Sequence, residues 1–454
     1  MKRSRKRRQL FLFIVDFCIL FAALYLALYI RNGVPPSSRS WHDHVGAFSF
    51  AFIGWAVIFY TAGLYALEKL FDGFRFAARL FWSIALSVLA TVLMFYLRPG
   101  RSIEPKTVML LFACLAYALL WLWRLAYGKL MRFSSITFNV AFIGMTDEVL
   151  LLADAIKDRP YLGYSLAFVH DEENLYPDSR LPTVTTQAEL ERTVEVTLPD
   201  LFVLLEGARL SSGTRRLLFG LIGRGARYVS LPEFYETIFR RVPIDAINDS
   251  WFLENIDLKA KKPYLMLKRL IDLIVSSVAL IISAPICALL VVAVLLESRG
   301  PVIFKQVRLG RGGKPFTILK FRTMRIEGNS FMPTSIGDTR ITRLGKFMRA
   351  SRLDELPQFI NIFRGDMSFV GPRPERPELA EKLEQSIPYY MERHLLKPGI
   401  TGWDQVSGEY HSPSVEDTYK KLQFDLYYIK NTSLFLDISI FFKTIMTVLS
   451  RSGR

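Results

Sequence analysis

Apolar runs of about 20 residues recur through the first third of this chain, and each is long enough for a helix to cross a lipid bilayer. They occupy residues 11–30, 47–65, 78–97 and 107–127. Hydrophobic residues make up 51% of the 454 residues and charged residues 22%, which excludes a disordered or acidic solvating chain. The sequence therefore predicts an integral membrane protein with a four-helix transmembrane anchor over residues 1–132.

The charges around these runs predict their orientation. Six basic residues in the opening MKRSRKRR should keep the N-terminus in the cytoplasm. The first run continues to Ile30 with large apolar residues, which is typical of an uncleaved signal anchor. Four crossings return the chain to the cytoplasm. Asp16, Arg79 and Arg124 lie near the ends of the runs, so we expect them to reach the membrane interface and not to form an ion path.

The net charge of +16 suits an anionic lipid surface, a phosphorylated substrate or a nucleic acid, and the charge alone does not choose among them. The three cysteines (Cys18, Cys114 and Cys287) lie in apolar runs without a CxxC pair, and the five histidines form no HExxH motif. We therefore expect neither a disulfide framework nor a cysteine or histidine metal site.

From about residue 136 the pattern changes to short apolar strands that alternate with amphipathic helices. This order predicts a Rossmann-like, doubly wound α/β middle domain over residues 136–250. The first strand ends at Gly144, which Met145, Thr146 and Asp147 follow in place of a GxGxxG turn; Asp171 follows the second strand, where a ribose-binding acid can lie. We expect no tight NAD or nucleotide binding here, and a structural or regulatory role.

A third apolar block follows Lys268 and Arg269 and continues to residue 296. A fifth crossing would place everything after Glu297 outside the cytoplasm. The alternative is a re-entrant helix over residues 268–297 that breaks near Pro285, because proline removes a backbone donor and clashes with the preceding turn. The residues alone favour neither topology clearly over the other. We predict the re-entrant helix, because it keeps the residues after Glu297 in the cytoplasm.

Unusual polar clusters follow between residues 300 and 406. The chain reads GPVIFKQVRLGRGGKPFTILKFRTM, then LDELPQFINIFRGDMSFVGPRPERPE, then LKPGITGWDQVSG. The first has the glycine content of a hairpin. In the second, Asp354 and Glu355 precede Pro357, and a proline at a helix start would place both acids near its positive end, where phosphate is also favoured. An isolated acid pair is usually an exposed helical one, but this dense motif favours a function.

These segments resemble the catalytic domain of the bacterial sugar transferases, the polyprenyl-phosphate hexose-1-phosphate transferases. The resemblance covers residues 263–454, and the anchor and middle domain resemble the long-form members. It implies an α-rich, monotopic catalytic domain at the bacterial inner membrane, facing the cytoplasm. The implied reaction transfers hexose-1-phosphate from a UDP-sugar to undecaprenyl phosphate, releases UMP, and starts an exopolysaccharide, capsule or O-antigen unit.

The resemblance also implies roles for residues. Asp354 would be the nucleophile and Glu355 would hold Mg²⁺, whose preference for hard oxygen ligands suits a carboxylate with phosphate oxygens. Arg373, between Pro372 and Pro374, would bind substrate. Further substrate-binding candidates, each with ordinary salt bridging as the alternative, are Lys320, Arg322, Arg349 and Arg308.

The expected partners are UDP-glucose or UDP-galactose, undecaprenyl phosphate and membrane lipid, with no nucleic acid; a homodimer is left open. Residues 434–449 are too short and too charged to cross, so they predict either an interfacial helix or a helix packed on the domain core. The alternative functions are a membrane-anchored regulatory or sensor protein with an inactive transferase-like domain, and a polytopic transporter.

Overall fold

The computed structural model describes residues 2–65, 73–96, 106–133, 137–174, 180–208, 210–325, 338, 340–407 and 414–449. Two compact units divide the chain between Phe239 and Arg240. The first contains the N-terminal helices and the α/β part. The second contains every residue that the sequence assigns to the chemistry.

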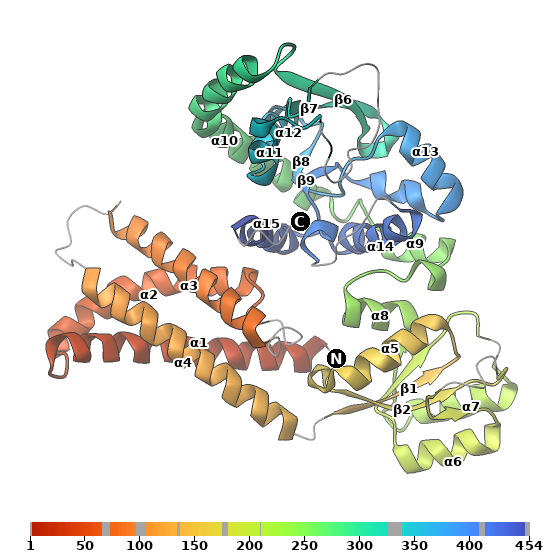
Figure 1. The fold of residues 1–454 in the computed structure, drawn as a ribbon. Helices are drawn as coiled ribbons and strands as arrows, with labels where there is room; N and C mark the ends of the chain where they lie inside the picture. The colour runs from red at the N-terminus through yellow and green to blue at the C-terminus, as the bar shows by residue number, and fades with distance from the viewer. Residues whose placement is uncertain are drawn as a thin grey trace. The chain divides into compact units, whose positions relative to one another are not determined.

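Four long helices form the N-terminal part of the first unit (Figure 1): α1 (Lys2–Asn32), α2 (Ser38–Thr61), α3 (Gly73–Tyr96) and α4 (Lys106–Phe133). Each contains an apolar stretch of 20 to 23 residues that is long enough to cross a membrane, so the predicted four helices are confirmed. The second helix begins earlier than predicted, because the Ser37 hydroxyl caps it by accepting a hydrogen bond from the Ser40 N–H.

The expectation that Asp16 and Arg124 reach the membrane interface is wrong. Their side chains are only 3% and 4% exposed, and Arg124 Nη2 lies 2.5 Å from Asp16 Oδ2. The guanidinium also lies 5.5 Å from the centre of the Tyr65 ring. Because an unpaired charge is costly away from water, the two charges pair inside the bundle and join α1 to α4.

The α/β part of the first unit has a parallel five-stranded sheet in the order β3-β2-β1-β4-β5, which confirms the predicted α/β class. Figure 1 shows α5 and α6 on opposite sides of it. The strands are β1 (Phe138–Ile143), β2 (Tyr164–His170), β3 (Thr183–Val184), β4 (Leu201–Leu204) and β5 (Arg227–Ser230). The helices are α5 (Asp147–Asp158), η2 (Pro160–Leu162), α6 (Gln187–Thr197), α7 (Ser212–Ile222) and α8 (Leu231–Phe239).

The second unit combines helices with two small sheets. The hairpin predicted from the glycine-rich segment is confirmed, since β6 (Ile303–Leu309) pairs antiparallel with β7 (Pro315–Phe321), and β8 (Ser368–Val370) pairs in parallel with β9 (Gly399–Thr401). The α-helices are α9 (Asp249–Asn255), α10 (Lys262–Glu297), α11 (Arg343–Ala350), α12 (Gln358–Arg364), α13 (Pro377–Ser386), α14 (Val415–Asn431) and α15 (Leu434–Leu449). The short 3₁₀ helices are η3 (Ile244–Ala246), η4 (Arg311–Gly313), η5 (Leu353–Glu355), η6 (Tyr390–Leu395) and η7 (Asp404–Val406).

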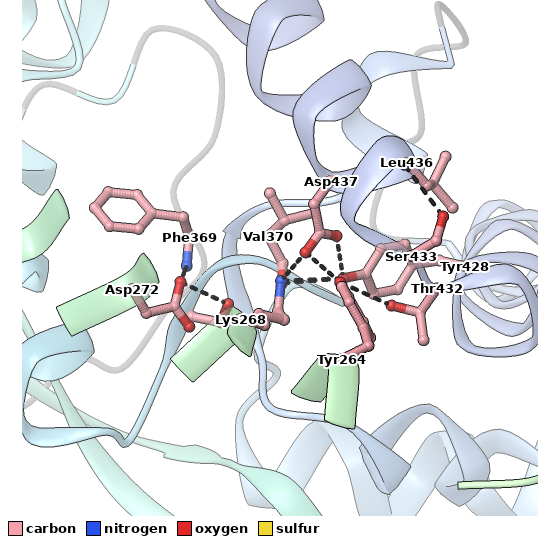
Figure 2. A network of polar contacts seen from close by, with 11 residues as sticks. Tyr264, Lys268, Asp272, Phe369, Val370, Tyr428, Thr432, Ser433, Leu436 and Asp437 are labelled. Atoms are coloured by element: carbon pink, nitrogen blue, oxygen red, sulfur yellow. Dashed lines mark hydrogen bonds and ion pairs between the residues drawn. The ribbon is translucent and has the colours of Figure 1, made fainter. Parts of the chain in front are cut away.

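A polar network joins the first turns of α10 to other elements of the second unit (Figure 2). Lys268 Nζ lies 2.5 Å from Asp437 Oδ2 of α15, and the Tyr264 hydroxyl donates to the same oxygen. One helical turn further on, Asp272 Oδ1 accepts from the Phe369 N–H at 3.2 Å. Because these three α10 residues are spaced by four, they share one face of the helix.

The last turns of α10 contact the same unit. Leu290 and Val294 pack against Phe321 and Met348. Arg322 donates to the carbonyl of Ser298, directly after the helix, at 2.6 Å. Figure 1 shows α10 beside α11 and α12. Both ends of this 36-residue apolar helix are therefore attached to elements of one compact unit.

The tail helix α15 has two different faces. Ile440 is fully buried in a core cluster with Trp403 and Tyr428. Phe435 and Phe441 are instead 51% and 39% exposed. One face therefore packs on the unit, as one of the two predictions requires, and the exposed aromatic residues leave the interfacial prediction open.

Candidate active site

The acid pair lies in η5, a single turn between α11 and α12. Arg352, which precedes the turn, has φ of +57°, a left-handed conformation that is uncommon for a residue other than glycine. Leu353 and Leu356 pack against the cluster that contains Phe321 and Met348. Apolar contacts on both sides of the acids thus hold a turn that begins with an unfavourable backbone conformation, a feature that often occurs at functional sites.

Three cations surround Glu355. Its Oε1 lies 2.9 Å from Lys320 Nζ and 3.7 Å from the nearest guanidinium nitrogens of Arg352 and Arg373. Burial raises the pKa of Glu355, but these cations outweigh burial and lower its pKa to about 2. Glu355 therefore stays ionised at any physiological pH.

Asp354 has the opposite electrostatic environment. Its side chain is buried, and burial together with the neighbouring Glu355 charge raises its pKa, against the lowering effect of Lys320, Arg349 and Arg352. The pKa of Asp354 is therefore higher than the pKa of the adjacent Glu355. A buried and more basic carboxylate is suited to nucleophilic attack, whereas a permanently charged one is suited to hold a cation.

Arg373 is partly exposed, with 43% of its side chain accessible, whereas 22% of the Lys320 side chain is accessible. The Arg373 backbone is nevertheless fixed. The Gly399 N–H donates to the Pro372 carbonyl at 3.0 Å, and Arg308 Nη1 donates to the Pro374 carbonyl at 3.0 Å. The carbonyl of Arg373 itself accepts from Arg393 Nη2 at 3.2 Å. A rigid backbone thus carries a guanidinium that solvent and substrate can reach.

The glycines of the two motifs allow β8 and β9 to approach closely. A Cβ on Gly399 would lie 2.2 Å from the Gly371 nitrogen, and a Cβ on Gly371 would lie 2.3 Å from the Lys397 carbonyl oxygen. Any side chain at either position would push the strands apart. The KPGITG segment therefore has a conformational role next to the segment that carries Arg373.

The remaining basic candidates divide into two groups. Lys320 contacts Glu355, and Arg349, whose Nε donates to Thr323 Oγ1 at 2.9 Å, acts on Asp354 electrostatically. Arg322 instead binds carbonyls at the end of α10, and Arg308 binds the Pro374 carbonyl and lies 3.5 Å from Glu375. Substrate binding stays a prediction for all of them, but the first two lie at the acid pair and the last two have structural partners.

Sequence reasoning did not identify Asn361 or the buried pair of Arg393 and Asp425. Asn361 is completely buried, accepts from the Leu319 N–H at 3.1 Å and donates to the Thr317 carbonyl at 2.7 Å. It joins α12 to β7 and so brings Lys320 to Glu355. Asn361 lies inside the LDELPQFIN motif, which is a usable signal, whereas Arg393 and Asp425 lie outside every motif.

The fit of Mg²⁺ to the acid pair depends on the substrate. Within the described ranges, no group of three or more histidine, cysteine, aspartate and glutamate side chains could hold a metal. Magnesium sites often use one or two carboxylates and take their other ligands from substrate phosphates and water. Glu355 therefore fits a cation that arrives with a phosphate substrate, and the acid pair does not form a complete protein cage.

The α/β part has its own cavity, at the carboxyl ends of β1, β2 and β4. Its lining includes Gly144, His170, Asp171 and Glu172. Gly144 has φ of +103°, and a Cβ there would lie 2.8 Å from the Leu205 Cβ, so this turn packs against a side chain. The acidic lining disfavours phosphate, but the predicted lack of tight nucleotide binding stays a prediction.

Comparison with known proteins gives a consistent result. A family model described as "Bacterial sugar transferase" matches residues 263–451. A UDP-glucose:undecaprenyl-phosphate glucose-1-phosphate transferase of Escherichia coli K12 is 29% identical over 94% of this chain and 88% of its own length. The protein of the same name from Caulobacter vibrioides is 40% identical over 40% of this chain and 70% of its own. A UDP-N-acetylgalactosamine-undecaprenyl-phosphate N-acetylgalactosaminephosphotransferase of Aeromonas hydrophila is 41% identical over about half of each chain, 49% and 52%.

Proposed function

Because the chain belongs to the bacterial sugar transferase family, we propose that it transfers a sugar-1-phosphate from a UDP-sugar to undecaprenyl phosphate. The products are UMP and a polyprenyl-diphosphate sugar. The observation that carries this proposal is the pair Asp354 and Glu355, whose pKa values are shifted in opposite directions, beside Lys320, Arg349 and Arg373. A reaction between two anionic phosphates needs a nucleophile and fixed positive charges, and this turn provides both.

The proposed path has two displacements at one phosphorus atom. A carboxylate oxygen of Asp354 attacks the β-phosphorus, the bond from that phosphorus to the oxygen bridging to the α-phosphate breaks, and UMP leaves with the electron pair. A phosphate oxygen of undecaprenyl phosphate then attacks the same phosphorus, and the bond to Asp354 breaks. The carboxylate is regenerated, and no proton needs to move.

The cations at the site have separate tasks in this proposal. Arg373, exposed and held by a fixed backbone, binds the phosphate oxygens, and Lys320 keeps Glu355 in place. Glu355, with substrate oxygens, would hold Mg²⁺, which would neutralise charge on the diphosphate. Burial of Asp354 keeps its carboxylate poorly solvated and therefore reactive.

A trapping experiment tests the path. Purified protein is incubated with a UDP-sugar radiolabelled in the β-phosphate, without lipid acceptor, and quenched. Wild type should retain label and Asp354→Asn should retain none, because the amide keeps the shape and removes the nucleophile. If wild type also retains no label and UMP appears only when both substrates are present, the lipid phosphate attacks directly and the covalent path is wrong.

The sugar is proposed as glucose or galactose, because two of the relatives compared above are named for glucose and galactose differs from glucose only in the configuration of one hydroxyl. The relative named for N-acetylgalactosamine makes an N-acetylated sugar the main competitor. UMP release from a panel of UDP-sugars with polyprenyl phosphate distinguishes the candidates. The highest kcat/KM identifies the donor, and a clear preference for an N-acetylated sugar would contradict the choice.

We also propose that α10 is re-entrant and that the site faces the cytoplasm at the inner membrane. Support comes from the attachment of Lys268 and of Ser298, which flank the apolar block, to the same compact unit. Cysteines placed at Arg299 and at Lys262 should both be labelled only from the cytoplasmic side. Labelling of Arg299→Cys from outside intact cells would show a straight fifth crossing.

A further inference from the structure

The segment Pro372, Arg373 and Pro374 makes three consecutive carbonyl hydrogen bonds to three separate parts of the second unit. The donors are the backbone of Gly399, the guanidinium of Arg393 and the guanidinium of Arg308. Neighbouring proline rings also fix the φ angle on both sides of Arg373. Because each of the three carbonyls accepts a hydrogen bond, the Arg373 backbone has little freedom, although its side chain is 43% exposed.

Arg393 is the central donor and is itself tightly held. Its side chain is 4% exposed, and its Nη2 and Nε lie 2.7 and 3.1 Å from Asp425 Oδ2 on α14. Its Nη1 donates to the Tyr390 hydroxyl at 2.7 Å. The bonds to Asp425 and Tyr390 fix the plane of the guanidinium, so the remaining Nη2 hydrogen has a defined direction toward the Arg373 carbonyl.

The strand that leads into this segment, β8, is held by side chains of α10 and α14. Asp272 of α10 accepts from Phe369 of β8, and the Tyr428 hydroxyl donates to the Val370 carbonyl at 3.3 Å (Figure 2). The backbone from residue 369 to residue 374 is therefore fixed by α10, α14, β9 and the hairpin. Among these contacts, Arg393 donates to the carbonyl of Arg373 itself.

We propose that Arg393, oriented by Asp425, is a positioning residue that sets the place of Arg373 at the reacting phosphate. The inference rests on the proposed function, because it requires that Arg373 binds phosphate. Arg393 is buried and its hydrogen-bonding groups face the protein, so it does not contact the substrate itself. Misplacement of a catalytic group by about 1 Å can cost on the order of a hundredfold in rate, so a backbone contact can have a large effect on catalysis.

A double-mutant cycle on UMP release tests the coupling. Arg393→Lys keeps the charge opposite Asp425 but loses the planar donor set, and it should lower kcat/KM for the UDP-sugar about tenfold. Arg373→Ala should lower it further. In the Arg373→Ala background, Arg393→Lys should cost nothing more, because the side chain that it positions is gone.

Arg322→Lys is the matched control, since Arg322 is also a buried arginine that donates to backbone carbonyls, but at the end of α10. Its effect should be independent of Arg373. If Arg393→Lys does not fold, as judged by its unfolding midpoint, Tyr390→Phe removes the hydroxyl that accepts from Arg393 Nη1 and should show a smaller loss of activity with the same loss of additivity.

The outcomes separate the inference from the proposed function. Additive effects of Arg393→Lys and Arg373→Ala would refute the positioning role and leave the proposed function intact. An unchanged rate in Arg373→Ala alone would refute the phosphate-binding role of Arg373, and the inference with it. Non-additivity at Arg393 combined with additivity at Arg322 supports the inference.

Discussion

Asp354 and Glu355 are neighbours in sequence, yet their surroundings raise the pKa of Asp354 and lower the pKa of Glu355. Lys320 comes from β7, Arg373 from the segment after β8, and Arg352 directly precedes the turn, and all three lie within 4 Å of Glu355. Asp354 has no comparable ion pair in the described part of the chain. At the scale of single residues, the proposed roles of the two adjacent carboxyl groups follow from which of them is surrounded by cations.

Removing the charge of Glu355 should affect both stability and activity. Glu355→Gln leaves Lys320 largely buried without its ion-pair partner, which should cost about 2 kcal/mol after allowance for partial exposure. UMP release should fall at least about a hundredfold. The double variant Lys320→Met with Glu355→Gln removes both charges and should recover most of the unfolding midpoint without recovering activity. Recovery of activity would show that Glu355 serves only to pair Lys320.

A second residue-scale prediction concerns acid stability. Burial, and next Arg393, lower the pKa of His394 to about 4 from an unfolded value of about 6.5. Between these values the unfolded chain binds the proton and the folded chain does not, so stability falls as pH falls through this window. At pH 5 the loss relative to pH 7 is about 2 kcal/mol.

The measurement is the unfolding midpoint of purified protein in detergent at pH 7 and pH 5. His394→Gln cannot take up a proton, so the difference between its two midpoints should be smaller than in wild type by the equivalent of that energy. Equal differences in both proteins would show that His394 is not responsible.

At the scale of elements, local patterns predicted what each segment forms but not what it touches. Alternating strands and helices predicted the α/β part, and the glycine-rich segment predicted the β6–β7 hairpin. The acid pair was also visible as a motif. Arg393 and Asp425 were not, because they lie 32 residues apart and meet only through tertiary packing. The interface prediction for Asp16 and Arg124 was wrong for the same reason, because these residues also meet only through tertiary packing.

Arg322 provides an element-scale prediction. The sequence suggests that it binds substrate, but its guanidinium donates to the Ser298 carbonyl at 2.6 Å and to the Val294 carbonyl at 3.4 Å, at the end of α10. Arg322→Gln should therefore lower the unfolding midpoint and increase hydrogen exchange at residues 290–298. In the folded fraction, KM for the UDP-sugar should stay within about twofold of wild type. A rise of tenfold or more would restore the substrate-binding role.

At the scale of the whole molecule, the predicted chemistry lies in one of the two units. The family match begins at residue 263, and residues just before it, including Val242 and Ile244, pack into the core of the same unit. Every residue named for the proposed site belongs to the second unit. The Caulobacter relative, of which 70% is matched by 40% of this chain, is a shorter protein with the same proposed activity in its name.

Residues 240–454 expressed alone should therefore fold in the membrane fraction and release UMP at a rate of at least about one tenth of the full chain. Asp354→Asn in the same fragment is the control for background hydrolysis. A folded but inactive fragment, with an unfolding midpoint near that of the full chain, would show that the first unit takes part in the reaction.

The pair of Asp16 and Arg124 has a consequence for biogenesis. The two residues are 108 positions apart, and synthesis at about 5–20 residues per second separates them by roughly 5 to 20 seconds. During that interval α1 carries an acid whose counter-charge has not yet been made. Assembly of the anchor is therefore completed late, when α4 arrives, and a ribosome that stalls before residue 124 leaves a membrane segment with an unmatched carboxyl group.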